Sequence, residues 1–295
     1  MSHHFSSVSL PPWLVLDDML KSWLLEDIGR GDRVTSHLFT SENHQTSAKW
    51  IVKEAGVIAG LPIASRVFYL LDNNINFTQK VNEGTFCEPG EIIAEIHGNF
   101  DALLTGERVA LNLAMRLSGI ATATRKYVEK IADLSTQLVD TRKTTPGLRI
   151  LEKYASFIGG ARNHRMGLDD GAMIKDNHIS IAGGIGNAIG LIRDKIPYPL
   201  SIEVETETLK QVEEALQHQV DIIMLDNMPL ETMRDAVQKI RHHNFHIKIE
   251  ASGNITLDTI RDVAETGVDY ISTSAPITRS TWLDLSMKMG TRDRF

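Results

Sequence analysis

The sequence has a single cysteine, Cys87, in 295 residues. One thiol cannot form an internal disulfide, and it cannot supply the cysteine cluster of a structural zinc site. No apolar run approaches the about 18 residues that a membrane-spanning helix needs, so the sequence excludes an integral membrane protein. The first residues also lack the basic stretch followed by an apolar stretch that marks a secretory leader. These absences predict a cytoplasmic protein that has no membrane partner.

An excess of positive charge is missing as well, because the formal net charge is -7. A general nucleic-acid binder needs many lysines and arginines for the phosphate backbone, so nucleic acid is not an expected partner. The net charge of the whole chain conceals a local excess of positive charge between residues 141 and 175, where there are seven basic residues and three acidic ones. A cationic patch in an acidic protein suggests a site for a small anion, although a solvated charged surface would have the same composition.

The chain changes character near residue 117. The earlier part combines a helical pattern over residues 13–25 with alternating, strand-like segments, which is typical of a small α+β unit. A long helix, or two, is expected over 107–133, with Gly119 as a possible break. The domains predicted from these patterns are an N-terminal domain, a catalytic domain, and a C-terminal tail packing back on the N-terminal domain; their bounds are 1–116, 117–280 and 281–295.

After residue 117, short apolar runs alternate with amphipathic helical stretches. The runs cover residues 137–140, 172–174, 200–204, 221–225, 247–250 and 268–272. This rhythm is typical of βαβ units that form a parallel sheet. Six strands are too few for a standard eight-stranded barrel. We therefore predict an α/β fold, a short α/β barrel of fewer than eight strands behind an N-terminal α+β sandwich, with a doubly wound open sheet as the alternative.

Polar residues follow every one of these runs. They are Thr141, Arg142 and Lys143, then Lys175, then Glu203 and Glu205, then Asp226, then Ser252, Gly253 and Asn254, and lastly Thr273, Ser274 and Ala275. Because the carboxyl ends of parallel strands open onto one face, these groups are expected to gather in one site, as in an enzyme. The last two sets form small-residue turns that could bind an anion at a helix N-terminus, or could be ordinary turns and caps.

The segment 159–171 is a long, glycine-rich connection that holds Arg162, His164 and Arg165. Arginine offers bidentate geometry to a carboxylate, and histidine adds a donor whose charge can be tuned. Together with Arg142 and Lys175, the segment favours a carboxylate-binding pocket. A surface loop with Asp169 and Asp170 as ion-pair partners is the alternative.

Several of these stretches resemble the signatures of the quinolinate phosphoribosyltransferase family. The central matches are DTRKTTPGLR, NHRMGL and IKDNHI, which lie at residues 140–149, 163–168 and 174–179. Further matches lie at residues 26–35, 106–113, 117–122 and 224–228, so the resemblance covers most of the chain. It implies transfer of phosphoribose from phosphoribosyl pyrophosphate to quinolinate with loss of carbon dioxide, which gives nicotinate mononucleotide and pyrophosphate. It also implies Mg²⁺ and a homodimer, and leaves a hexamer open.

The resemblance assigns roles to individual residues. Arg142, His164, Arg165 and Lys175 would hold the two carboxylates of quinolinate, and Arg108 would reach in from a partner subunit. Lys143 would meet the pyrophosphate. Glu203 and Asp226 would contact the ribose hydroxyls together with Mg²⁺, directly or through water. Thr141 and the two turns at Ser252–Asn254 and Thr273–Ala275 would complete the substrate site. We expect Lys143, Lys175, Glu203 and Asp226 to carry the catalysis.

One departure from the family and three rival functions stay open at this point. The family usually has glycine where this chain has Ser274, which narrows the space for a phosphate at that turn. The rivals are a relative with a different acceptor, a barrel lyase in which Lys175 or Lys143 forms a Schiff base, and a non-catalytic anion sensor.

Overall fold

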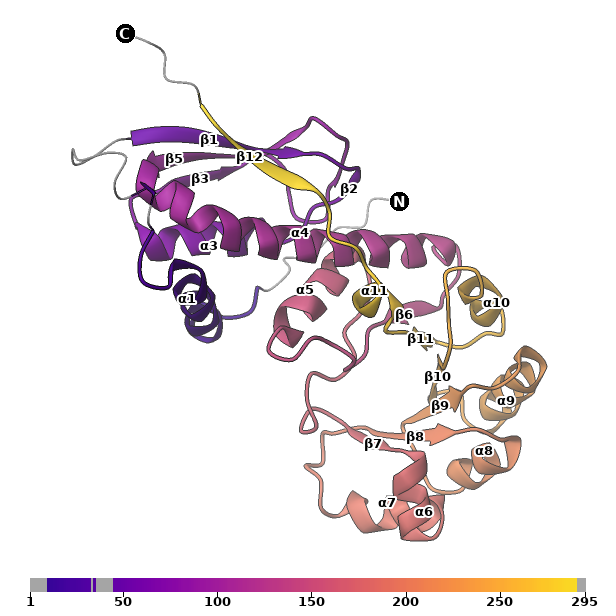
Figure 1. The fold of residues 1–295 in the computed structure, drawn as a ribbon. Coiled ribbons are helices and arrows are strands. Elements are labelled where there is room, and N and C mark those ends of the chain that lie inside the picture. The colour runs from indigo at the N-terminus through magenta and orange to yellow at the C-terminus, as the bar shows by residue number, and fades with distance from the viewer. Residues whose placement is uncertain (1–9, 33, 36–44, 291–295) are drawn as a thin grey trace. The chain divides into compact units, whose positions relative to one another are not determined.

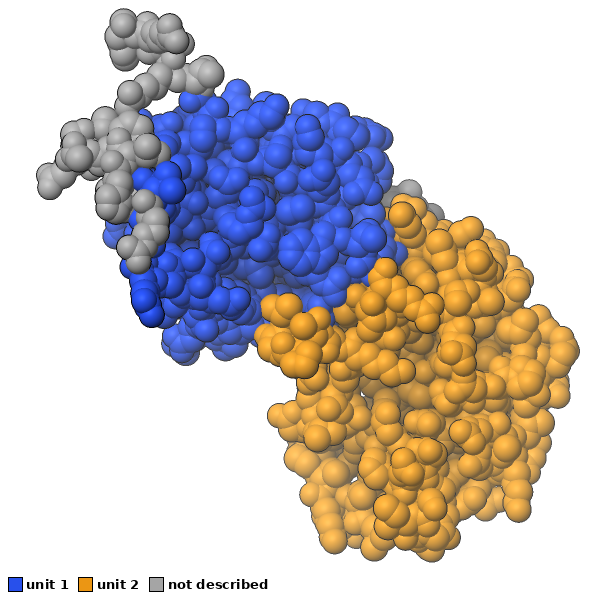
Figure 2. All heavy atoms as spheres, viewed as in Figure 1, with its two compact units in different colours: residues 1–123, 150–159, 280–295 blue, residues 124–149, 160–279 orange. Residues whose placement is uncertain are grey.

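The computed structural model describes residues 10–32, 34–35 and 45–290. It divides into two compact units, each built from separated segments of the chain (Figure 2). Unit 1 comprises Met1–Ala123, Ile150–Gly159 and Ser280–Phe295, and unit 2 comprises Thr124–Arg149 and Gly160–Arg279. The division differs from the predicted contiguous domains, because a helix from the middle of the chain belongs to unit 1. Arg33 of the matching stretch 26–35 and residues 291–295 of the tail lie outside the described residues.

Unit 1 contains a four-stranded antiparallel sheet in the order β12-β1-β5-β3 (Figure 1). Its strands are β1 (Gln45–Val52), β3 (Asn76–Gln79), β5 (Ile92–Asn99) and β12 (Leu285–Met289). A second, two-stranded pair consists of β2 (Gly56–Val57) and β4 (Phe86–Cys87). The C-terminal strand β12 lies beside β1, with Met287 opposite Trp50. Part of the C-terminal tail is therefore an edge strand of the unit 1 sheet.

The helices of unit 1 are α1 (Trp13–Ile28), α3 (Leu61–Leu71), the unit 1 part of α4 (Phe100–Lys130), and nearly all of α5 (Arg149–Gly159). Trp50, Phe68 and Phe77 meet in the core, where the rings of Trp50 and Phe77 pack edge to face with centroids 5.8 Å apart. Of the two alternatives, one long helix or two, the single helix is confirmed, because α4 continues through Gly119. A Cβ at this position would lie 1.9 Å from the carbonyl oxygen of Thr281, so the glycine permits close packing.

Unit 2 contains six parallel strands in the order β6-β11-β10-β9-β8-β7. They are β6 (Gln137–Val139), β7 (Ala172–Ile174), β8 (Ile202–Thr206), β9 (Ile222–Asp226), β10 (Lys248–Ser252) and β11 (Tyr270–Ser272). Each lies within or beside one of the six predicted runs. The helices are α6 (Asp176–Ala182), α7 (Ile185–Arg193), α8 (Leu209–Leu216), α9 (Leu230–His243), α10 (Ile260–Ala264) and α11 (Ala275–Thr278).

The two faces of the unit 2 sheet differ in chemistry. Ile202, Val204 and Ile223 belong to a large apolar cluster with residues of α7, α8 and α9. The alternate positions, including Glu203 and Glu250, carry polar side chains to the opposite face. A doubly wound sheet buries both faces under helices and has apolar residues on both. The polar inner face therefore excludes that alternative and matches a short α/β barrel of six strands.

Among the described residues, no helix combines the length and the apolar character that crossing a bilayer requires.

Candidate active site

The polar residues at the carboxyl ends of the unit 2 strands surround a cavity of about 430 Å³. Ten of the predicted site residues line it: Thr141, Arg142, Lys143, His164, Arg165, Lys175, Asp226, Ser252, Gly253 and Asn254. They come from the ends of four strands and from the connection between β6 and β7, which are separated in sequence by up to about a hundred residues. The sheet topology brings them together because all its strands are parallel.

Two arginines of this cavity lie close enough to repel each other. Burial lowers the pKa of Arg165, and the neighbouring Arg142 cation lowers it further. Arg165 donates to the carbonyl oxygen of Gly171 at 2.9 Å, which fixes the guanidinium against its own loop. The Nε atom of Arg142 is buried and has no hydrogen-bond partner among the described residues. A buried donor without a partner beside a second cation calls for an anion that accepts from both.

Lys175 and Lys143 add further positive charge to the cavity. Lys175 directly precedes α6, and its backbone N–H donates to Nδ1 of His178 at 3.0 Å. His178 of the IKDNHI stretch thus caps the helix and orients the lysine. Lys143 is exposed, and its backbone N–H donates to the Thr141 hydroxyl at 3.0 Å. The Thr141–Lys143 turn and the start of α6 therefore present both lysines from defined backbone positions.

The carboxylate wall of the cavity differs from the prediction. Glu205 and Asp226 line the cavity, and Glu203 does not. Burial raises the pKa of Glu205, the negative charge of Asp226 raises it further, and Lys175 lowers it. Glu203 and Glu205 share the inner face of β8, and Glu205 lies nearer the carboxyl end of the strand. The alternating pattern of the sequence is the same for both, and the depth of the cavity along β8 distinguishes them.

Glu203 lies deeper, where it is 4% exposed and contacts His164. It lines a second cavity of about 530 Å³, which also reaches Ile222, Lys248 and Tyr270 at the starts of three strands. The structure therefore places Glu205, and not Glu203, with Asp226 in the wall of the first cavity.

The turn after β10 depends on a glycine. Gly253 has a φ of +96°, and a Cβ there would lie 2.2 Å from Oδ1 of Asn227. The Asn227 side chain donates to Asp226 at 2.7 Å and accepts from the Asn254 side chain at 3.0 Å. Close approach at Gly253 thus allows a hydrogen-bonded row that orients Asp226. The prediction assigned no role to Asn227, which follows Asp226 directly. It also assigned none to Glu250, which lines the cavity as well.

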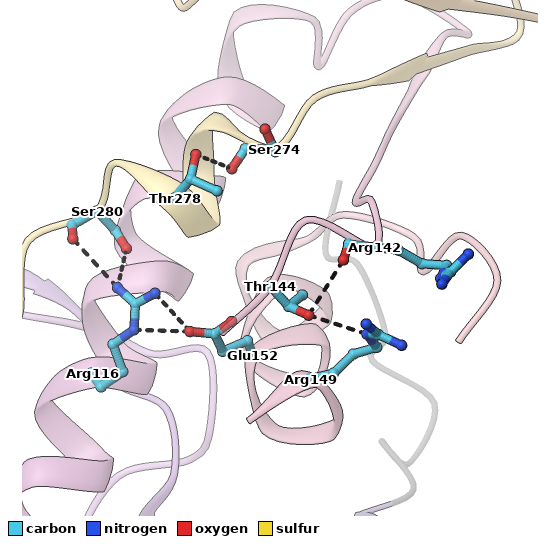
Figure 3. Close-up of polar contacts among 8 residues, drawn as sticks. All are labelled: Arg116, Arg142, Thr144, Arg149, Glu152, Ser274, Thr278 and Ser280. Carbon is cyan, nitrogen blue, oxygen red and sulfur yellow. Dashed lines mark hydrogen bonds and ion pairs between the residues drawn. The ribbon is translucent and has the colours of Figure 1, made fainter. Parts of the chain in front are cut away.

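The second predicted turn does not line the cavity. Thr273, Ser274 and Ala275 are absent from its wall, which ends at Ser272 on that strand. The backbone N–H of Ala275 donates to the Thr273 hydroxyl at 3.3 Å. The Ser274 carbonyl accepts from the Thr278 hydroxyl at 3.0 Å (Figure 3). The helices that follow the two turns are short, since α10 has five residues and begins only at Ile260, and α11 has four residues.

The loops that carry Arg142 and Arg165 are tied together by side chains with no substrate role in the prediction. Asp140 is 2% exposed and accepts from the Asn163 side chain and from the His164 backbone N–H. Arg149 donates to the Thr144 hydroxyl at 3.1 Å (Figure 3). It also donates to the carbonyl oxygen of Met166 at 3.1 Å. These contacts hold the segment 159–171 against the end of β6.

The charges of the window 141–175 do not form one patch. Lys153 and Glu152 are buried on α5 in unit 1, whereas Arg142, Lys143, Arg165 and Lys175 line the cavity of unit 2. Arg162 lines the second cavity. Arg108 lies exposed on α4 in unit 1 and is not among the residues of either cavity.

Comparison with known protein families identifies both parts of the chain. Residues 33–118 match the quinolinate phosphoribosyl transferase N-terminal domain, and residues 120–288 match the C-terminal domain of the same family. The chain belongs to the quinolinate phosphoribosyltransferase family. The matched regions contain every residue of the candidate site as well as Arg108.

Relatives in this family are similar over nearly their whole length. The chain is 58% identical over 280 residues to a probable nicotinate-nucleotide pyrophosphorylase [carboxylating] of Synechocystis, covering 95% of this chain and 94% of that one. It is 45% identical to the probable enzyme of the same name from Bacillus subtilis, covering 93% of each chain. The solved structure of NadC from Streptococcus pyogenes superposes with a TM-score of 0.90 at 41% identity, covering 95% of this chain and 98% of that chain.

Proposed function

We propose that this enzyme transfers phosphoribose from phosphoribosyl pyrophosphate to quinolinate and releases carbon dioxide, giving nicotinate mononucleotide and pyrophosphate. Membership of the quinolinate phosphoribosyltransferase family and the names of its relatives support this activity. The observation that carries the proposal for this chain is the cation-lined cavity, in which the buried Nε atom of Arg142 lacks an acceptor and Arg165 lies close by.

Quinolinate fits this cavity because it carries two adjacent carboxylates. One carboxylate would accept from Arg142 and the other from Arg165, and Lys175 would neutralise the remaining charge. Each arginine can offer two parallel N–H groups to a carboxylate, which fixes the orientation of the pyridine ring as well as its position. His164 lines the same cavity. The attraction of both guanidinium groups to the dianion would then outweigh the repulsion between the two cations.

Mg²⁺ and the ribose hydroxyls would lie at the opposite wall, beside Glu205 and Asp226. The donor set suits the ion, because Mg²⁺ prefers carboxylate oxygens and water. Burial raises the pKa of Glu205 and the negative charge of Asp226 raises it further, so the two carboxylates lie close to each other. When bound, Mg²⁺ would neutralise the charge that grows on the departing pyrophosphate. Asn227 and Asn254 would keep the Asp226 carboxylate in place.

The phosphate groups would bind at the remaining parts of the site. Lys143, exposed at the rim, would contact the pyrophosphate, and the turn Ser252–Asn254 would hold the 5′-phosphate of the ribose. The turn Thr273–Ala275 is a weaker candidate for this phosphate, because its Ala275 N–H is already bonded to Thr273. The serine hydroxyl of Ser274 is the group of that turn that could still donate to a phosphate.

The reaction then follows from the placement of these groups. The pyridine nitrogen attacks the anomeric carbon of the ribose as the bond from that carbon to pyrophosphate breaks. Lys143 stabilises the leaving oxygens, and Glu205 and Asp226 stabilise the positive charge on the sugar ring. The alkylated ring then accepts electrons, so the bond to the adjacent carboxylate breaks, carbon dioxide leaves, and the carbanion takes a proton from solvent. Arg142, Arg165 and Lys175 orient the diacid throughout.

The proposal includes a homodimer in which Arg108 of one subunit enters the site of its partner. Its support is the family resemblance and the exposure of Arg108 on α4. Mixing inactive Arg108→Ala subunits with inactive Lys175→Ala subunits should restore activity, since a hybrid dimer has one site with both residues intact. No recovery on mixing would contradict the shared site.

A cytoplasmic location is also proposed, because a chain with one cysteine suits a reducing compartment.

The activity is tested by incubating the protein with quinolinate, phosphoribosyl pyrophosphate and Mg²⁺, and by measuring nicotinate mononucleotide and carbon dioxide by mass spectrometry. We expect both products in equal amounts and none without the pyrophosphate donor. Binding of quinolinate without product would indicate an anion sensor. A carbonyl substrate that borohydride reduction links covalently to Lys143 or Lys175 would indicate a Schiff-base lyase. Product formation with a different acid, and none with quinolinate, would indicate a relative with a changed acceptor.

A further inference from the structure

The substrate cavity offers little apolar surface to the pyridine ring of the proposed acceptor. Of the described residues in its wall, Met173 and Met224 have apolar side chains, and the others present charged or polar groups or, at Gly253, backbone. Arg142 and Arg165 would bind the carboxylates at the edge of the ring, so the flat faces of the ring need an apolar partner. The two methionines can supply it, because a thioether packs favourably against an aromatic ring.

Met173 is the methionine that contacts a carboxylate-binding residue. It lies on β7, and its Sδ accepts from Nη2 of Arg165 at 3.5 Å, whereas Nη1 of the same guanidinium donates to the carbonyl oxygen of Gly171 at 2.9 Å. Sulfur is a weak acceptor, so the bond to Gly171 does more to fix the guanidinium. The contact nevertheless places the Met173 side chain beside the cation that would bind the acceptor, and hence beside the ring.

A third cavity, of about 470 Å³, shares Arg165 and Met173 with the substrate cavity. The rest of its wall is largely aliphatic and includes Ile181 of α6 and Leu191 of α7, which are 88% and 58% exposed. This cavity is therefore an apolar groove that is open to solvent. Because the same two side chains line both spaces, they form the partition between a charged site and an apolar one.

The two residues of the partition differ in what they can recognise. Arg165 recognises the charge of a carboxylate, and its guanidinium is held by hydrogen bonds from both terminal nitrogens. Met173 recognises shape, because its unbranched side chain fills the space between the ring and the groove. An alkyl group on the ring would meet this side chain, although the groove behind it has the apolar character that an alkyl group favours.

We propose that Met173 is a specificity-determining residue, which limits the acceptor to an unsubstituted pyridine ring by closing the substrate cavity against the apolar groove. This inference rests on the proposed function, because it takes a pyridine diacid as the acceptor. Shortening the Met173 side chain would join the two spaces. The variant should then accept a ring that carries an alkyl group, which the wild type rejects because its cavity is filled.

Three analogues of quinolinate, with an ethyl group at ring carbon 4, 5 or 6, test the partition. Calorimetric titration of the full-length protein, without the pyrophosphate donor, gives the ratio of the dissociation constant of each analogue to that of quinolinate. In the wild type the ratio should be at least about 10, because the filled cavity has no room for the ethyl group. In Met173→Ala at least one ratio should fall about tenfold or more, because the ethyl group buries apolar surface in the groove.

Met173→Ala should also weaken the binding of quinolinate itself, by about 3- to 10-fold, because the ring loses its thioether contact. Met173→Leu conserves the volume of the side chain, so its ratios should stay those of the wild type. Leu191→Trp in the Met173→Ala background should narrow the groove and raise the lowered ratio again. Met224→Ala shortens the methionine that does not line the groove, and should weaken quinolinate binding without lowering a ratio.

The proposal is overturned if no ratio falls tenfold in Met173→Ala, or if Met224→Ala lowers a ratio equally. A loss of stability cannot imitate the expected result, because a loosened site does not gain affinity for a larger ligand. Should Met173→Ala fail to fold, Met173→Val, which also removes the thioether, decides the matter. Wild-type protein that does not bind quinolinate contradicts the proposed function, whereas quinolinate binding without the gain in Met173→Ala contradicts the partition alone.

Discussion

One glutamate of unit 1 and two glutamates of unit 2 differ in how fully their carboxyl oxygens are hydrogen-bonded. In unit 1, the carboxylate of Glu83 accepts from the backbone N–H groups of Gly60 and Leu61 and from the Tyr154 hydroxyl, at 2.7, 2.9 and 2.7 Å. In unit 2, Glu203, Glu250 and Arg142 each keep a buried atom without a partner among the described residues. A carboxylate whose oxygens are all hydrogen-bonded stabilises the fold. A buried polar group that lacks a hydrogen-bond partner indicates a site for a ligand or for a charge.

Two arginines make the same contrast. The Arg116 guanidinium in unit 1 donates to Glu152 at 2.7 and 3.2 Å and to the Ser280 hydroxyl at 2.9 Å (Figure 3). The Arg142 guanidinium lines the open cavity of unit 2 with its Nε unused. The first arginine joins α4, α5 and the segment before β12, so it stabilises unit 1. The second is available to a substrate.

The largest effect should come from breaking the satisfied pair of unit 1. Glu152→Ala leaves the partly buried Arg116 cation without its carboxylate, and we expect a loss of about 3–5 kcal/mol in the free energy of unfolding. Urea denaturation followed by circular dichroism measures it. The KM for quinolinate of the remaining folded enzyme should stay within about twofold of the wild type. A stable variant with impaired quinolinate binding would reverse the assignment of the two arginines.

Arg142→Ala should do the opposite. Loss of a charged bidentate partner costs about 2–3 kcal/mol of binding, which corresponds to an increase in the KM for quinolinate of about 30- to 150-fold. The free energy of unfolding should not fall, because the guanidinium has no acid partner to lose. Arg234→Ala, on the exposed surface of α9, is the matched control and should leave KM unchanged. An unchanged KM in Arg142→Ala would remove this residue from the carboxylate pocket.

Within unit 2, the carboxylates of β8 can be separated by their dependence on Mg²⁺. Glu205→Gln removes one of the two oxygen ligands proposed for the ion, so kcat/KM should fall by about 100-fold and half-saturation should require more Mg²⁺. Steady-state rates over a Mg²⁺ titration measure both changes. Glu207→Gln, an exposed neighbour at the end of the strand, is the control. Normal Mg²⁺ activation in Glu205→Gln together with its loss in Glu203→Gln would restore the sequence-based choice of Glu203.

Much of the unit 2 architecture could be predicted because its strands leave a strong local pattern. Apolar runs ending in polar residues identified six strands, and the parallel topology follows from their spacing. Arg142, Arg165 and Lys175 could be predicted as site residues because a cationic side chain directly after a buried strand or in a glycine-rich connection seldom stabilises the fold there. The long helix through Gly119 was harder, since the reason for that glycine is Thr281, which lies far away in the sequence.

The choice between Glu203 and Glu205 could not be settled from the pattern. Both lie on the inner face of one strand, and the depth of the cavity decides which one reaches it. The roles of Asp140 and Asn227 also depend on partners brought together by the fold, since Asp140 holds the His164 backbone and Asn227 lies against Gly253. Residues whose function is to orient another residue leave a weak signal in a single sequence, because their chemistry is the same as that of a cap or a turn.

The smallest effect concerns Cys87, a buried group of unit 1 with no role in the site. It is 1% exposed, and burial, followed by the nearby Glu91, raises the pKa of its thiol to about 12. A raised pKa favours the neutral thiol, so at pH 8 only about one molecule in 10⁴ carries the reactive thiolate. Native protein should therefore not react with a disulfide reagent such as DTNB within an hour, whereas protein in guanidinium should release one equivalent of chromophore. Cys87→Ala should keep kcat/KM within about twofold. Rapid reaction of the folded protein would show that the β2–β4 pair, on which Cys87 lies, opens readily, and that the burial of Cys87 does not protect its thiol.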